Sequence, residues 1–145
     1  MINWTNFDKL AAYGKLDALK GSVNLVEAMA GESGAERVTK YAVPMVCGLN
    51  YSYAAKAVND EILSALCALA EEAQLAEKYK ALYSGEVINT GEKRLVLHQL
   101  TRGQLGAKVE ADGVDKRAFY TEQQAKIAAF AGKVHRGEIV NEAGE

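Results

Sequence analysis

One stretch of the chain gathers side chains that could hold an anion or move a proton. Its polar members are Arg94, His98, Thr101 and Arg102. At about 100° per residue in a helix, these four fall on one arc, and the apolar side chains between them fall on the opposite side. One interpretation is a basic stripe that faces a binding site or a second subunit. The alternative, which we favour, is a set of side chains that bind backbone carbonyls or acidic groups at a packing surface.

Two carboxylates beside this stretch, Glu86 and Glu92, could be read as an acid–base pair. The spacing of Asn89 and Glu92 favours a structural role, because an asparagine that caps a helix is often matched by a glutamate three residues later. We expect Glu86 to serve a turn in a similar way.

The segment Gly31-Glu32-Ser33-Gly34 is the best imitation of a phosphate-binding loop in the chain. Such loops follow a strand and present backbone N–H groups to the anion. No preceding strand is visible here, and Glu32 would repel a phosphate. We therefore expect a plain turn.

Cys47 and Cys67 are the only cysteines. Two thiols in such a chain indicate a reducing compartment and small buried side chains. A disulfide or half of a metal site is the less favoured alternative, because His98 and His135 are not placed at ligand spacing. We assign no catalytic, cofactor-binding or metal-binding residue, and we expect no cofactor.

The composition is that of an ordinary soluble globular protein, with 49% hydrophobic and 25% charged residues. The length of 145 residues suits a single domain spanning residues 1–145. The net charge of −2 does not favour a nucleic-acid partner. The start lacks the apolar region of a secretory signal, and no stretch reaches the roughly 18 apolar residues of a membrane span. We expect a cytoplasmic protein without a membrane partner.

Helices dominate the expected structure, because alanine, leucine, lysine and glutamate favour them. We expect helices over residues 7–20, 38–42, 60–82 with a break near Gln74, 89–102 and 121–137. Asn59 opens the third of these helices, Thr121 with Gln124 forms a capping box for the last, and Gly85 and Gly137 end helices. The Asp112-Gly113 turn favours a strand pair. The predicted fold is mostly α, with at most this short strand pair near residues 107–115.

The region from Tyr83 carries a resemblance to a known family. It reads YSGEVINTGEKRLVLHQLTR. This resembles the glucose-6-phosphate isomerase segment (F/M)-S-G-E-x-I-N-x-T-E-x-R-x-V-L-H-x-A-L-R. The matching positions are Ser84, Gly85, Glu86, Ile88, Asn89, Glu92, Arg94, Val96, Leu97, His98 and Arg102. The resemblance is strong from about Val58, where the upstream leucine-rich helix also fits, and weak before it.

Several positions depart from the family pattern. Gly91 stands in place of Thr, Thr101 in place of Leu, and Leu95 in place of a small residue. The Asn-Arg-Ser that often follows the motif is replaced by residues 103–105. These departures indicate a divergent branch and concern the local helix packing more than the family.

The resemblance implies that this chain is the N-terminal helical segment of a longer enzyme. That enzyme has two α/β sugar-isomerase (SIS) subdomains, works as a homodimer in the cytoplasm, and interconverts glucose 6-phosphate and fructose 6-phosphate without metal or cofactor. Its catalytic base, its ring-opening group and its phosphate pocket lie beyond the stretch present here. The Arg94, His98 and Arg102 stripe would at most approach the sugar-phosphate site.

Two hypotheses follow. In the first, the chain is part of a glucose-6-phosphate isomerase and is inactive alone. In the second, it is a free-standing, non-catalytic helical interaction module descended from that region. We prefer the first, because the chain ends about where the family's first catalytic strand should begin.

Overall fold

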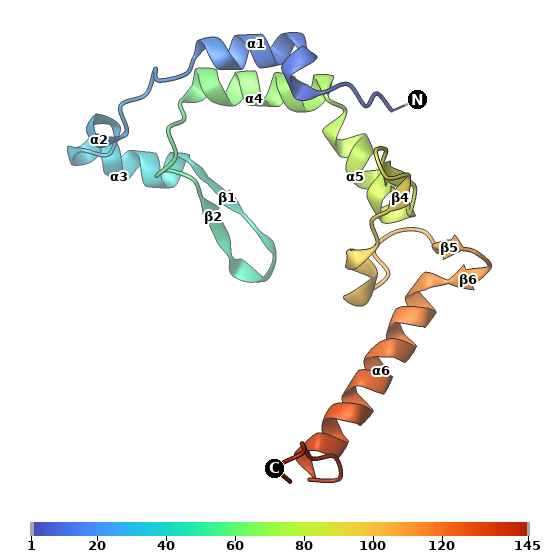
Figure 1. The fold of residues 1–145 in the computed structure, drawn as a ribbon. Helices are drawn as coiled ribbons and strands as arrows, with labels where there is room; N and C mark the ends of the chain where they lie inside the picture. Colours follow the sequence, from blue (N-terminus) through green and yellow to red (C-terminus); the bar gives the residue numbers. More distant parts are fainter. Residues whose placement is uncertain (1, 145) are drawn as a thin grey trace. The chain divides into compact units, whose positions relative to one another are not determined.

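The computed structural model describes residues 2–144 and is mostly helical, with three short antiparallel strand pairs (Figure 1). The chain divides into two compact units, one that ends at Leu75 and one that begins at Ala76. Each unit is described by itself.

The first unit is built from helices and one hairpin. Its helical elements are η1 (Phe7–Lys9), α1 (Ala11–Ala18), α2 (Leu25–Ala28), α3 (Gly31–Lys40), η2 (Val46–Gly48) and α4 (Asp60–Glu72). Strands β1 (Ala42–Pro44) and β2 (Asn50–Ser52) pair antiparallel, with Val43 opposite Tyr51. Helices α1 and α4 lie side by side (Figure 1), and Ala12 and Ile62 are buried on them.

The start of α1 is capped from a distant part of the chain. Leu10 at the N-cap position offers no side-chain hydrogen bond. Instead, the Glu72 carboxylate accepts from the backbone N–H groups of Ala11, at 3.0 Å, and Ala12, at 2.7 Å. These two bonds tie the first turn of α1 to the last residue of α4 and satisfy helix N–H groups that have no partner within the helix.

The second unit has a small core beside two short hairpins. Its elements are α5 (Leu75–Ser84), β3 (Val87–Asn89), β4 (Arg94–Leu95), η3 (His98–Thr101), β5 (Glu110–Ala111), β6 (Val114–Asp115) and α6 (Lys116–His135). Strand β3 pairs with β4 and β5 with β6, both antiparallel. Leu97, Leu100 and Val109 form the buried cluster, with Leu95 and Tyr120 packed against it.

Several predicted boundaries are confirmed. Asn59 caps α4, because its side chain accepts from the N–H of Ile62 at 2.8 Å. The break near Gln74 is present, since this residue has a φ of 53°. Gly85 and Gly137 follow helices α5 and α6 with positive φ. The predicted strand pair near residues 107–115 corresponds to β5 and β6.

The predicted helix over residues 89–102 is wrong. Asn89 and Glu92 do bond as expected: the N–H of Glu92 donates to Asn89 Oδ1 at 3.1 Å, and Asn89 Nδ2 donates to Glu92 Oε2 at 3.3 Å. These bonds close the turn between β3 and β4 instead of opening a helix. Lys93 has a φ of 53°, which a continuing right-handed helix does not allow.

The predicted start of the last helix is also wrong. Helix α6 begins five residues earlier than Thr121, at Lys116, and its cap is Asp115, whose side chain accepts from the N–H of Ala118 at 3.0 Å. The Thr121 hydroxyl donates back to the Arg117 carbonyl. The capping-box spacing of Thr121 and Gln124 therefore lies inside a continuous helix.

Two further expectations fail in the first unit. The predicted turn at residues 31–34 is the first turn of α3. Gly34 is buried there, and a Cβ atom at this position would lie 2.2 Å from the Met29 carbonyl oxygen. The predicted helix over residues 7–20 is divided at Leu10 into η1 and α1.

The expectation of at most one strand pair is wrong, since β1–β2 and β3–β4 also form. These strands are two or three residues long and carry no clear alternation of apolar and polar residues. Because strand preference depends strongly on context, segments this short carry too little pattern to be predicted.

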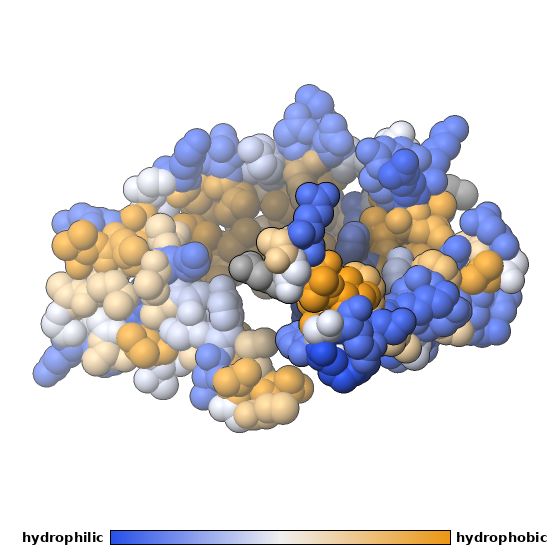
Figure 2. Space-filling view, turned by 60° about the horizontal axis from the view of Figure 1, so that its bottom comes forward, coloured by the Kyte–Doolittle hydropathy of each residue, from blue (hydrophilic) through white to orange (hydrophobic). Residues whose placement is uncertain are grey.

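Much apolar surface is exposed in both units. Figure 2 shows apolar residues, in orange, reaching the surface at several places. The most exposed large apolar side chains are Val26, Val46, Leu49, Leu105, Ile127 and Phe130. Among residues 2–144, no helix is long and apolar enough to cross a bilayer.

Candidate functional site

The side chains singled out in the 94–102 stretch do not share a helical face. Arg94 lies on β4, His98 and Thr101 begin and end η3, and Arg102 follows it. The Arg94 Nε lies 3.8 Å from Glu92 Oε2 with both side chains exposed, so this ion pair is worth little. The Thr101 hydroxyl donates to the His98 carbonyl at 2.8 Å. The structure therefore does not assemble the basic stripe, which was the less favoured of the two interpretations.

Three other side chains hold η3 in place. Gln99 donates to the Leu82 carbonyl at 3.0 Å, and Gln124 donates to the Thr101 carbonyl at 2.8 Å. Arg117 Nη1 donates to the Leu100 carbonyl. Sequence reasoning missed these residues, because long side chains that bind distant carbonyls follow no local spacing rule. These three contacts hold the backbone of η3 in position, and none of them brings a reactive group into a site.

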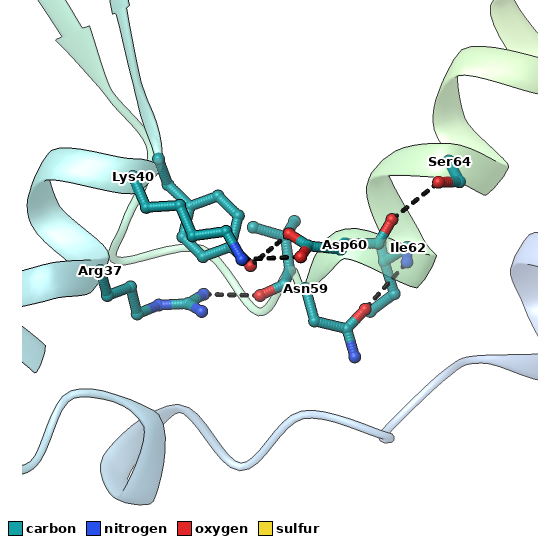
Figure 3. A network of polar contacts seen from close by, with 8 residues as sticks. Arg37, Lys40, Asn59, Asp60, Ile62 and Ser64 are labelled. Atoms are coloured by element: carbon teal, nitrogen blue, oxygen red, sulfur yellow. Dashed lines mark hydrogen bonds and ion pairs between the residues drawn. The ribbon is translucent and has the colours of Figure 1, made fainter. Parts of the chain in front are cut away.

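The most extensive polar cluster of the first unit surrounds Arg37 (Figure 3). This residue lies on α3 and is only 8% exposed. Its Nε donates to the Ala54 carbonyl at 2.7 Å, and its Nη2 donates to the carbonyls of Lys56, at 2.8 Å, and Val58, at 2.6 Å. The guanidinium carbon also lies 4.5 Å from the centre of the Tyr41 ring. Arg37 therefore organises the whole segment that leads from β2 to α4.

Asp60, the first residue of α4, completes this cluster. Its Oδ2 lies 2.6 Å from the Lys40 ammonium, and its Oδ1 accepts from the Tyr41 hydroxyl at 3.0 Å. The Lys40 contact, with help from Tyr41, holds the pKa of the Asp60 carboxyl below its usual value, and the same contact raises the pKa of Lys40. Both side chains remain largely open to water, so the pair orients α3 and α4 more than it stabilises them.

The hollow beside this cluster has mixed charge. It measures about 210 Å³ and is lined by Ala28, Ser33, Glu36, Arg37, Lys40 and Tyr41. Ser33 donates its hydroxyl to the Ala30 carbonyl, and three donor hydrogens of Arg37 are committed to backbone. The surroundings of residues 31–34 thus form a structured helix start and not a phosphate loop.

A second, larger hollow of about 390 Å³ is open and mainly apolar. Its lining residues are Tyr13, Leu16, Asp17, Leu19, Lys20, Gly21, Val23, Ala57 and Ile62. Asp17 is its single carboxylate, and no histidine or second carboxylate accompanies it. Moving a proton to or from carbon needs a positioned general base together with further polar groups, so this single carboxylate does not form such a site.

The remaining candidate residues also have no arrangement that indicates a reactive site among residues 2–144. The N–H of Glu86 donates to the Ala81 carbonyl, which with the Gly85 bond to Leu82 forms a Schellman-type end for α5. Cys47 and Cys67 are both exposed, so the prediction of buried cysteines is wrong. Within residues 2–144, no three histidine, cysteine, aspartate or glutamate side chains gather as metal ligands would.

Comparison with known proteins gives a consistent result. The family model described as Phosphoglucose isomerase matches residues 52–145. The glucose-6-phosphate isomerase of Treponema pallidum (strain Nichols) is 46% identical over 142 residues, which cover 95% of this chain and 26% of the relative. That of Treponema denticola is 44% identical over 148 residues, covering 99% of this chain and 28% of the relative.

A less similar relative aligns over the same extent. The glucose-6-phosphate isomerase of Borreliella burgdorferi (strain ZS7) is 35% identical over 147 residues, which cover all of this chain and 27% of the relative. The chain therefore spans about a quarter of the length of the curated relatives that it matches.

Proposed function

Because the chain belongs to the phosphoglucose isomerase family, we propose that it is the N-terminal part of a longer enzyme that interconverts glucose 6-phosphate and fructose 6-phosphate. The observation that carries this proposal is the family match over residues 52–145, together with relatives of 44–46% identity along nearly the whole chain.

We assign the chemistry of this reaction to parts of the enzyme outside this chain. Isomerisation needs a carboxylate that moves a proton between two carbons, and such a base works best with a pKa near the operating pH. The carboxyls with displaced pKa values among the described residues, Asp60, Glu72 and Asp115, are all displaced downward by hydrogen bonds that hold them in structural roles. These structural roles support the proposal that this chain contributes to the framework of the enzyme and supplies no catalytic residue.

The framework consists of two parts. Helices α1 and α4, joined by Glu72, form one. The β3–β4 and β5–β6 hairpins and η3, with Leu100 in the core, form the other. We propose that residues 1–145 form one N-terminal helical part of the enzyme, that the two catalytic SIS subdomains follow it, and that the whole acts as a cytoplasmic homodimer. The sugar phosphate binds only in the full enzyme.

A coupled assay tests this proposal. The full-length protein and the 145-residue chain are each given fructose 6-phosphate, and the glucose 6-phosphate formed is oxidised by an added dehydrogenase that reports as NADPH. The full-length protein should be active, and the chain alone should match the blank.

Each half of the assay can contradict the proposal. Isomerisation by the chain alone would place a catalytic site within it. An inactive but folded full-length protein would remove the proposed activity.

A further inference from the structure

The β1–β2 hairpin carries an apolar, uncharged surface on an exposed element. Residues 42–52, which we call the apolar arm, contain no charged side chain. Its exposed large side chains are Val43, Met45, Val46, Leu49 and Tyr51. The end of the arm forms an orange patch at the lower edge of Figure 2. Turns at the tips of hairpins are usually polar and rich in Asn, Asp and Ser, whereas this tip reads Met45-Val46-Cys47-Gly48-Leu49.

The base of the arm is held firmly. The N–H of Tyr53 donates to the Tyr41 carbonyl at 2.9 Å, and the rings of these two residues lie 5.6 Å apart. Arg37 binds the Ala54 carbonyl directly below. Within the arm, the N–H of Met45 donates to the Leu49 carbonyl at 2.7 Å. The apolar tip is therefore presented by a defined structure.

The arm is too small to remain stable in water by itself. A two-stranded hairpin is marginal, and both of its edges are open to further pairing. A contiguous apolar surface on such an element indicates an interaction site. Absence of charge indicates a permanent interface, since charged residues are depleted at the centre of such interfaces.

We propose that the apolar arm is covered, in the full-length enzyme, by a segment of the same polypeptide that lies outside these 145 residues. This inference rests on the proposed function. About three quarters of the length of the relatives lies outside the matched region, which supplies the covering chain. A hairpin with two open edges and apolar side chains is stabilised when its edges and its side chains are all enclosed. The core of its own subunit can enclose such a hairpin more completely than a flat contact with a second subunit can.

The native Cys47 at the tip provides the test, because its thiol is exposed in the isolated structure. The full-length enzyme is treated with a maleimide, and labelling of each cysteine is followed by peptide mass spectrometry. Cys47 should react at least about tenfold more slowly than in the urea-unfolded protein, because labelling then requires local opening. The matched control is Ser22→Cys, an exposed polar position of the same unit that should remain reactive.

Two outcomes would overturn the proposal. If Cys47 reacts as fast as the Ser22→Cys control, the arm is not covered. If protection is lost on dilution into separate subunits, the second copy of the chain covers the arm. Isomerase activity is measured on the same sample. An active enzyme with a reactive Cys47 would rule out this inference alone, whereas an inactive enzyme would rule out the proposed function.

A second variant checks the energetic role of the arm. Val46→Asp places a charge at the tip and should lower the thermal midpoint of the full-length enzyme, because the charge would have to be buried without a partner. Ser22→Asp, which places the same charge at an exposed polar position of the same unit, is the control and should leave the midpoint nearly unchanged. Equal midpoints for the two variants would contradict the proposal.

Discussion

Arg37 joins residues that are distant in sequence through a single buried side chain. Its guanidinium donates to three carbonyls of the segment between β2 and α4, 17 to 21 residues away. Buried carbonyls without donors are costly, so Arg37 contributes directly to the course of this segment.

Replacing Arg37 therefore tests the organisation of the first unit. Arg37→Ala in the full-length enzyme should lower the free energy of unfolding by about 3 kcal/mol, because several buried acceptors lose a charged donor. Urea unfolding followed by circular dichroism measures the change. Arg136→Ala is the control: this arginine is 62% exposed and pairs with Glu138, and its loss should cost less than about 0.5 kcal/mol. Equal effects would show that the Arg37 contacts do not stabilise the unit.

Glu72 makes the stability of the α1–α4 pair depend on pH. Hydrogen bonds from the N–H groups of Ala12 and Ala11 hold the pKa of its carboxyl below the usual value of 4.5. Protons therefore bind the unfolded chain more readily than the folded one. The contribution of Glu72 is fully present above pH 4.5 and is lost as the pH falls through the lowered folded value.

The variant Glu72→Gln should remove this dependence. It should be less stable than the parent near neutral pH, and the difference should shrink as the medium becomes acidic enough to protonate Glu72. Thermal midpoints measured across the acid range give the comparison. Glu71→Gln, one residue away on the exposed surface of α4, is the control. A difference between Glu72→Gln and the parent that does not change with pH would contradict the assignment.

At this scale, local spacing predicted the partners that lie close in sequence. The Asn59 cap and the Asn89–Glu92 contacts are such cases. The contacts of Arg37 and Glu72 could not be predicted, because the partners of Glu72 lie 60 and 61 residues away and no spacing rule connects them.

Among the elements, the end of α5 shows how a turn and a core contact are combined. Gly85 takes a φ of 73°, and the bonds of Gly85 and Glu86 close the helix in a Schellman-type arrangement. A Cβ atom at Gly85 would lie 2.5 Å from Val109, a member of the core cluster. Gly113 has nearly the same φ, 72°, but nothing lies within 4 Å of its Cβ position.

The two glycines separate backbone strain from steric overlap. Gly113→Ala should cost about 1 kcal/mol through the left-handed conformation alone, and Gly85→Ala should cost about 2–3 kcal/mol, because overpacking adds to that strain. Urea unfolding of the full-length enzyme measures both. The double variant Gly85→Ala with Val109→Ala should cost less than the sum of its two single variants, because the smaller side chain removes the overlap. Equal costs for the two glycine variants would contradict the close packing of α5 against Val109.

The helices were easier to predict than the strands. The apolar spacing and the caps of the segment from Asn59 to Gly85 predicted α4, the break and α5. The hairpins β1–β2 and β3–β4 escaped prediction because strands of two or three residues carry too little pattern. The motif from Ser84 to Arg102 identified the family correctly, although its residues form strands and a short 3₁₀ helix instead of the expected helix.

For the whole molecule, the exposed apolar residues and the coverage of the relatives lead to the same expectation. Large apolar side chains are exposed in both units, and the chain spans about a quarter of the relatives' length. Both facts favour a part of a larger isomerase over the alternative of a free-standing interaction module. Residue patterns alone could predict the family but not which surfaces are covered, because the residues that we propose as the cover lie outside this sequence.

The intact mass of the polypeptide purified from its source cell tests this central claim most directly. We expect roughly four times the 15.6 kDa of this chain, as the 26% coverage of the relatives implies. A product of 15.6 kDa would contradict a continuous isomerase chain and would make a separate, non-catalytic module the better account.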